Sequence, residues 1–91
     1  MQLNLKGKVA MVAASSKGLG FGIALELARE GAKLSIGSRS KSGIESAAKK
    51  LRQETEAEVL TSILDASNQQ SIQDWTIRTT DHFGGVDILV V

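Results

Sequence analysis

The sequence predicts an α/β fold, namely the first half of a doubly wound parallel sheet with helices on both faces. Strand-length apolar runs alternate with segments of helical periodicity along the whole chain, in the order β-α-β-α-β-α-β. The first and last runs, VAMVAA and VDILVV, are almost continuously apolar, as in strands that a parallel sheet buries on both faces. With right-handed crossovers, the expected strand order across the sheet is 3-2-1-4.

The four predicted strands are residues 9–14, 34–37, 59–64 and 86–91. The first helix follows a glycine-rich segment and is expected to end at Gly31, since glycine commonly terminates helices. Its predicted inner face repeats at helical spacing and consists of Ile23, Ala24, Leu27 and Ala28.

The two other helices are predicted from capping patterns. Ser42 and Glu45 form a capping-box pattern at the start of the second helix. Ser67 or Asn68 is expected to cap the third helix, which a pair of glycines ends. The predicted inner faces consist of Ile44, Ala48 and Leu51 in the second helix, and of Ile72, Trp75 and Thr79 in the third.

The composition excludes several classes of function. The chain has 91 residues, enough for one small domain, and a net charge of +1 with both signs mixed. This balance, with only 3% aromatic residues, argues against a nucleic-acid surface or a membrane surface. Cysteine is absent, which rules out disulfides and thiolate metal sites and fits a cytoplasmic protein. We expect no metal.

A glycine-rich segment, residues 13–22 with the sequence AASSKGLGFG, joins the first predicted strand to the first helix. Helix N-termini carry free N–H groups and the positive end of the helix dipole, so they bind phosphate. Gly18 and Gly20 lack side chains that would keep a pyrophosphate from the backbone. The strict G-x-G-x-x-G pattern fails, because Ile23 occupies its last position. We expect a phosphate-binding loop; the alternative is a tight turn without a ligand.

Four segments of the chain follow one another in a characteristic order: residues 5–9 (LKGKV), 13–20 (AASSKGLG), 64–66 (LDA) and 83–90 (FGGVDILV). By these segments the chain resembles the short-chain dehydrogenase/reductase family, and within it the 3-oxoacyl-acyl-carrier-protein reductases. The resemblance runs the whole length and implies a Rossmann-type NAD(P)-binding fold. The implied contacts in the first loop are Ala14, Ser16, Lys17, Gly18, Leu19 and Gly20.

The loop departs from the family motif T-G-x-x-x-G-x-G at two positions. Ala13 stands in place of the threonine and Ala14 in place of the first glycine. The methyl group of Ala14 disfavours positive φ, so the loop has to adopt a conformation that an L-residue accepts. The loop is similar to a subgroup variant of the family motif.

The end of the second predicted strand indicates NADP(H) over NAD(H). NAD-preferring dinucleotide folds place an acid there to accept from the ribose 2′-hydroxyl, whereas this chain has Ser38 followed by Arg39. Arg39 can form a charge-assisted fork to a 2′-phosphate, and Lys17 can add a second cation. Ser38 and Ser16 can add hydroxyl donors. The alternative is that these are ordinary solvated charges.

The resemblance assigns Asp65 and Ala66, after the third predicted strand, to the adenine pocket. Asp65 would accept from the adenine amino group, and the backbone of Ala66 would line the pocket. The alternative for Asp65 is a loop residue that caps a turn. Asp87, at the start of the last strand, and His82 are predicted to be structural rather than catalytic.

The implied activity is hydride transfer between a nicotinamide cofactor and a small carbonyl, alcohol or acyl substrate. The family's catalytic Ser, Tyr and Lys, in a Y-x-x-x-K pattern, would lie beyond Val91, and the chain contains no Tyr. Residues 1–91 are thus interpreted as a truncated NAD(P)-binding domain, inactive alone, of a protein expected to form a homotetramer. Two alternatives stay open: a non-catalytic nucleotide-binding module, and a structural fragment that self-associates through residues 86–91.

Overall fold

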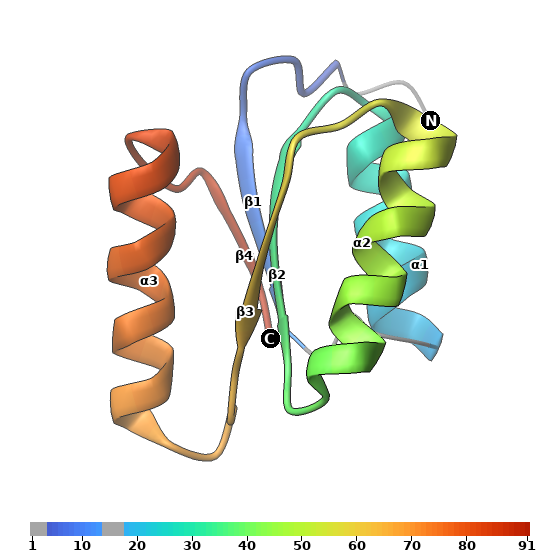
Figure 1. Ribbon diagram of the computed structural model, residues 1–91. Helices are drawn as coiled ribbons and strands as arrows, with labels where there is room; N and C mark the ends of the chain where they lie inside the picture. The colour runs from blue at the N-terminus through green and yellow to red at the C-terminus, as the bar shows by residue number, and fades with distance from the viewer. Residues whose placement is uncertain (1–3, 14–17) are drawn as a thin grey trace.

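The computed structural model describes residues 4–13 and 18–91. Its four strands form one parallel sheet in the order β3-β2-β1-β4, which confirms the predicted fold and strand order. Helices α1 and α2 cover one face of the sheet and α3 covers the other (Figure 1). The elements are β1 (Val9–Ala13), α1 (Gly18–Arg29), β2 (Lys33–Ser38), α2 (Lys41–Thr55), β3 (Val59–Ile63), α3 (Gln69–Phe83) and β4 (Ile88–Val90).

Strand β4 is shorter than the predicted strand of residues 86–91, and the prediction that it is buried on both faces is wrong: Leu89 is 57% exposed, because β4 is the outermost strand of the described sheet. Asp87 lies directly before β4. The backbone N–H of Asp87 donates to the carbonyl of Val9 over 2.9 Å, and its carboxylate accepts from the N–H of Val9, also over 2.9 Å. Asp87 therefore ties the start of β4 to the start of β1, in line with the structural role predicted for it.

The predicted capping box at Ser42 is wrong. Ser40 is the N-cap of α2, in an extended conformation, and its hydroxyl accepts from the N–H of Gly43 over 3.0 Å. Ser42 lies inside the first turn, and the Glu45 carboxylate accepts from the hydroxyl of Thr61 over 2.7 Å. For α3, where two caps were open, the cap is Asn68, whose side chain accepts from the N–H of Ser71 over 3.1 Å.

The core has two layers, one on each side of the sheet. Strand β1 is buried along its whole length, as predicted for a strand covered on both faces. Its residues alternate between the layers. Ala10 and Val12 join the larger core under α1 and α2, while Met11 and Ala13 join a smaller core under α3. The smaller core also contains Leu64 and Trp75.

A closed chain of hydrogen bonds holds α3 on the sheet. The indole N–H of Trp75 donates to the hydroxyl of Ser35 over 3.0 Å, and the hydroxyl of Thr79 donates to the carbonyl of Trp75 over 2.7 Å. The Ser35 and Thr79 hydroxyl oxygens lie 2.6 Å apart. Because the Thr79 proton is already used, Ser35 is the donor of this bond. All three side chains are buried.

Two arginines cover the open edge of the sheet at β3. Arg52 from α2 donates to the carbonyl of Val59 over 2.7 Å, and Arg78 from α3 donates to the carbonyl of Thr61 over 3.2 Å. These carbonyls belong to alternate residues and point away from β2. An unpaired edge invites pairing with another strand, and charged side chains placed on it oppose such pairing.

Replacing Ser35 with Ala tests the polar network under α3. The variant leaves the buried indole N–H of Trp75 without an acceptor and removes the donor to Thr79. We expect the free energy of unfolding to fall by about 1–3 kcal/mol. Urea unfolding followed by circular dichroism measures this change. The control is Ser46→Ala, at an exposed position of α2, for which we expect a change within about 0.5 kcal/mol. If the free energy of unfolding falls equally in both variants, the hydrogen bonds of Ser35 do not stabilise the fold as described.

Candidate functional site

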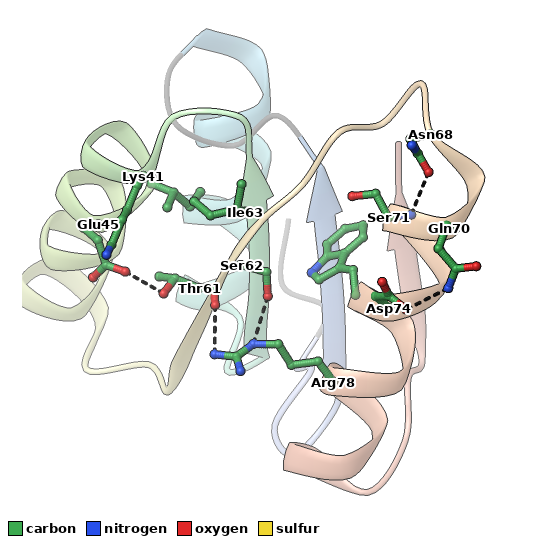
Figure 2. A pocket seen from close by; sticks show the side chains of 12 residues that line it. Lys41, Glu45, Thr61, Ser62, Ile63, Asn68, Gln70, Ser71, Asp74 and Arg78 are labelled. Carbon is green, nitrogen blue, oxygen red and sulfur yellow. Dashed lines mark hydrogen bonds between the residues drawn. The ribbon is translucent and has the colours of Figure 1, made fainter.

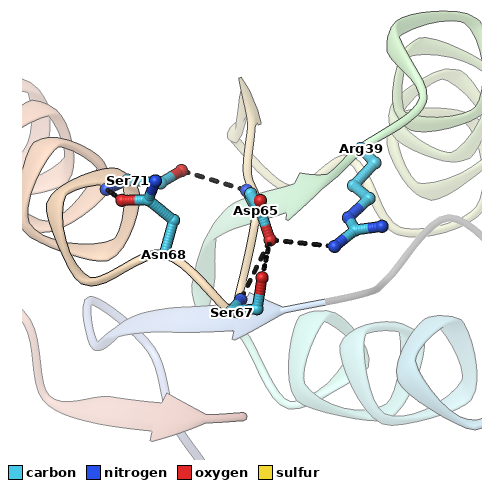
Figure 3. A network of polar contacts seen from close by, with 5 residues as sticks. All are labelled: Arg39, Asp65, Ser67, Asn68 and Ser71. Carbon is cyan, nitrogen blue, oxygen red and sulfur yellow. Dashed lines mark hydrogen bonds and ion pairs between the residues drawn. The ribbon is translucent and has the colours of Figure 1, made fainter.

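Parallel strands bring the segments that follow β1, β2 and β3 to one edge of the sheet. In open α/β sheets, ligands bind outside the carboxyl ends of the strands. Here α1 begins with Gly18 after β1, Arg39 and Ser40 follow β2, and Asp65 follows β3 after one intervening residue. Figure 3 shows Arg39 and Asp65 facing each other beyond the ends of their strands.

A cavity of about 330 Å³ lies at this edge. Four of the predicted site residues line it, so the structure brings together the two residues predicted to bind adenine, Asp65 and Ala66, and two of those predicted to bind a 2′-phosphate, Ser38 and Arg39. The lining consists of Ser38, Arg39, Ser40, Leu64, Asp65, Ala66 and Ser67.

The two walls of this cavity are held together by the backbone. The N–H of Leu64 donates to the carbonyl of Ser38 over 2.9 Å, which extends the β2–β3 ladder beyond Ile63. Gly37 allows the close approach, because a Cβ atom at this position would lie 2.8 Å from the Cβ of Leu64. This role of Gly37 was not predicted from the sequence, although a glycine within a strand pattern indicates that another part of the chain approaches closely.

Asp65 lies at the centre of the polar contacts in the cavity wall. Its Oδ1 accepts from the hydroxyl of Ser67 over 2.6 Å, from the N–H of Ser67 over 3.0 Å and from Nη2 of Arg39 over 3.1 Å (Figure 3). The Ser67 hydrogen bonds, followed by Arg39, lower the pKa of Asp65 from 3.8 to about 2. The carboxylate is therefore ionised throughout the neutral range.

The turn-capping alternative for Asp65 is observed, yet it leaves half of the carboxylate available. All three hydrogen bonds end on Oδ1. Within residues 4–13 and 18–91, no donor bonds to Oδ2 of Asp65. One oxygen therefore holds the turn, and the other can accept from a ligand.

The hydroxyl of Ser38, predicted to donate to a phosphate, already donates to another residue of the chain. Its side chain is buried, and its hydroxyl donates to the carbonyl of Ser40 over 3.2 Å. The hydroxyl proton is thus engaged within the chain, so contact with a phosphate requires Ser38 to exchange this bond.

The glycine-rich loop is described only from Gly18 onward; Ala14, Ser16 and Lys17 lie outside the described residues. Gly18 is the first residue of α1 and has a φ of +67°, a conformation that favours glycine. Leu19 is 81% exposed and Gly20 is half-buried. The first turn of α1 contains no acidic residue, so no side chain in that turn offsets the positive end of the helix dipole.

A larger cavity, of about 580 Å³, lies over the β3 edge between α2 and α3. Its polar side chains mostly bond to one another: Arg78 donates to Ser62 over 3.1 Å and Gln70 to Asp74 over 2.9 Å (Figure 2). Among the described residues, none of the predicted site residues lines it.

Across the ranges 4–13 and 18–91, no helix has the length and apolar character needed to cross a membrane. The same ranges contain no group of three or more His, Asp or Glu side chains suited to holding a metal ion.

The parallel sheet of order 3-2-1-4, the glycine at the start of α1 and the cavity at the carboxyl edge define a Rossmann-type α/β fold. The family model for short chain dehydrogenases matches residues 8–91. The chain therefore belongs to the short-chain dehydrogenase family, as its resemblance predicted.

Relatives of the chain are oxidoreductases of different kinds. An uncharacterized oxidoreductase of Staphylococcus saprophyticus is 35% identical over 97% of this chain and 38% of its own length. A 3-oxoacyl-acyl-carrier-protein reductase of Vibrio cholerae is 40% identical over 97% of this chain and 34% of its own length. The chain thus spans between 34% and 38% of these relatives.

The structure also resembles a solved reductase. The crystal structure of L-sorbose reductase from Gluconobacter frateurii, complexed with NADPH and L-sorbose, superposes with a TM-score of 0.93 at 31% identity. The match covers 98% of this chain and 34% of that protein.

Titration of Asp65 tests the cause of its low pKa. Following its carboxyl carbon by NMR, we expect a pKa of about 2 in the wild type. Ser67→Ala should raise the pKa more than Arg39→Gln does, because the Ser67 hydroxyl makes the largest contribution. The pKa of Asp65 is lower in the folded chain than in the unfolded chain, so the ionised carboxylate stabilises the fold. This contribution to the free energy of unfolding is fully present above about pH 4 and is lost as the pH falls toward about 2. A larger rise in Arg39→Gln contradicts this order.

Proposed function

We propose that residues 1–91 form the NADP(H)-binding part of a short-chain oxidoreductase that transfers a hydride between NADP(H) and a carbonyl or alcohol substrate. The observation that carries the proposal is the cavity at the carboxyl ends of β2 and β3. Its walls contain a cation, Arg39, at the end of β2, where NAD-preferring folds have an acid.

The residues of the cavity suit the adenosine end of the cofactor. The free Oδ2 of Asp65 can accept from the adenine amino group, and Ala66 lines the same space. The guanidinium of Arg39, with a side chain 75% exposed, retains N–H groups for a 2′-phosphate and a flat face for adenine. Ser38 can contribute after exchanging its bond to Ser40.

The start of α1 suits the pyrophosphate. Gly18 is exposed, and apart from its chain neighbours and the backbone of its own helix, no described atom lies within 4 Å of where its Cβ would be. The N–H groups of the first helical turn have no intrahelical acceptor and carry the positive end of the dipole. The proposed cofactor contacts in this loop are Ala14, Ser16, Lys17, Gly18, Leu19 and Gly20, of which Ser16 and Lys17 are proposed to reach the 2′-phosphate.

The proposal for the whole protein rests on its relatives. Bound nicotinamide supplies the hydride chemistry. In this proposal, residues 1–91 are the truncated cofactor half, and the catalytic Ser, Tyr and Lys lie beyond Val91. The Vibrio cholerae relative makes a 3-oxoacyl thioester the leading substrate among small carbonyl compounds. A cytoplasmic homotetramer is the proposed state of the full-length protein.

Arg39→Gln tests the cofactor assignment. A charge-assisted hydrogen bond to phosphate contributes about 1.5–3 kcal/mol, and exposure reduces this value. We expect the affinity for NADPH to fall about 10-fold, while the affinity for NADH falls less, because NADH loses only the stacking of the guanidinium on adenine. Isothermal titration calorimetry with both cofactors measures the two affinities.

The control for this experiment is Arg29→Gln, which removes an equally charged residue at the other end of α1, where Arg29 pairs with Glu26. It should leave both affinities unchanged. Equal losses for NADPH and NADH in Arg39→Gln would argue against recognition of the 2′-phosphate. An oligomer that binds neither cofactor would instead support the self-associating fragment.

Turnover tests the proposal for the whole protein. Residues 1–91 contain no Tyr and should not oxidise NADPH in the presence of a carbonyl substrate. A full-length protein that continues with a Y-x-x-x-K motif should reduce 3-oxoacyl thioesters, with loss of the near-ultraviolet absorbance of NADPH. Tight NADPH binding by the full-length protein without turnover of any carbonyl compound would support the non-catalytic module.

A further inference from the structure

Two residues proposed to read different parts of the cofactor bind each other in this structure. Nη2 of Arg39 lies 3.1 Å from Oδ1 of Asp65. The residues are 26 positions apart and come from the ends of different strands. Both line the same cavity, and their side chains are 75% and 44% exposed.

The contact uses Nη2 of Arg39 and Oδ1 of Asp65. It leaves Oδ2 of Asp65 able to accept from adenine. Within the described ranges, Arg39 has no acceptor other than Asp65, so this one carboxylate determines where the guanidinium lies. Asp65 is itself held by two bonds from Ser67. The more firmly fixed member of the pair is therefore the acid.

The pair also affects the charge of the cavity. Of the seven described residues that line it, only Arg39 and Asp65 carry charge, and their formal charges are opposite. A 2′-phosphate approaching Arg39 meets a cation already paired and a carboxylate beside it. A ribose 2′-hydroxyl carries no charge. The pairing of Arg39 and the repulsion by the Asp65 carboxylate therefore affect its binding much less.

We propose that Asp65 is a specificity-determining residue that limits the preference for NADP(H) over NAD(H) by holding and partly neutralising Arg39. This inference rests on the proposed function, since it assumes that the cavity binds the adenosine end of the cofactor. Asp65 then has two effects: Oδ2 contributes to the binding of both cofactors, and Oδ1 weakens only the binding of the phosphorylated one.

Asp65→Asn separates the two effects. The amide oxygen can still accept a hydrogen bond, whereas the negative charge that pairs with Arg39 is removed. Exposed ion pairs change equilibria only modestly, so we expect the ratio of NADH to NADPH dissociation constants to rise about 2- to 5-fold. The ratio is measured by calorimetry at low ionic strength, and the rise should shrink as salt is added.

A double-mutant cycle shows whether the effect acts through Arg39. Asp65→Asn introduced into Arg39→Gln should change the ratio little, because the cation that Asp65 neutralises is gone. Asp81→Asn removes the same charge from an exposed position of α3 and should leave the ratio unchanged.

Several outcomes overturn the inference. One is an unchanged or lowered ratio in Asp65→Asn. Another is an equal rise in the Arg39→Gln background, which would indicate a general field effect. If Asp65→Asn does not fold, Asp65→Ser carries the same expectation. Wild-type protein that binds neither cofactor overturns the proposed function itself, whereas binding of both with an unchanged ratio overturns only the role of Asp65.

Discussion

The proposed site depends on the register between the ends of β2 and β3. The hydrogen bond from Leu64 to the carbonyl of Ser38 carries the parallel ladder one residue beyond β3, and Gly37 lets Leu64 lie against the backbone of β2. Because Arg39 follows one strand end and Asp65 the other, this register sets the distance between the two charged side chains. Side-chain contacts elsewhere in the cavity follow from this backbone arrangement.

The rest of the fold keeps this edge in place. Apolar layers on both faces fix the sheet, and α3 is fastened further by the closed chain of bonds through Ser35, Trp75 and Thr79. None of these three residues lines the cavity at the carboxyl ends of the strands, so the network supports the fold without contributing to the proposed ligand contacts. Exposed arginines have different partners at two places on the sheet. Along the outer strand β3, they donate to backbone carbonyls, whereas at the carboxyl ends of the strands Arg39 pairs with a carboxylate.

Periodicity and alternation were sufficient to predict the strand order, the two-sided burial of β1 and the inner faces of the helices. The errors came from contacts that are distant in sequence. The S-x-x-E pattern at Ser42 matched a capping box, but Glu45 bonds to Thr61 across the β3 edge, and Ser40 is the cap. The strand at the C-terminal end was predicted too long, because the bonds of Asp87 to Val9 cannot be read from local sequence. The pairing of Arg39 with Asp65 likewise depends on two strand ends that meet only in the fold.

The central claim is that the carboxyl edge of β1, β2 and β3 binds the dinucleotide. Amide chemical-shift mapping by ¹H–¹⁵N NMR during an NADPH titration tests it most directly. We expect shifts of the amide signals of residues 18–20, 38–40 and 65–67, and no shifts at the opposite end of the strands, for example at Gly31 and Gly84. Shifts confined to the cavity between α2 and α3, or no shifts at saturating NADPH, would contradict it.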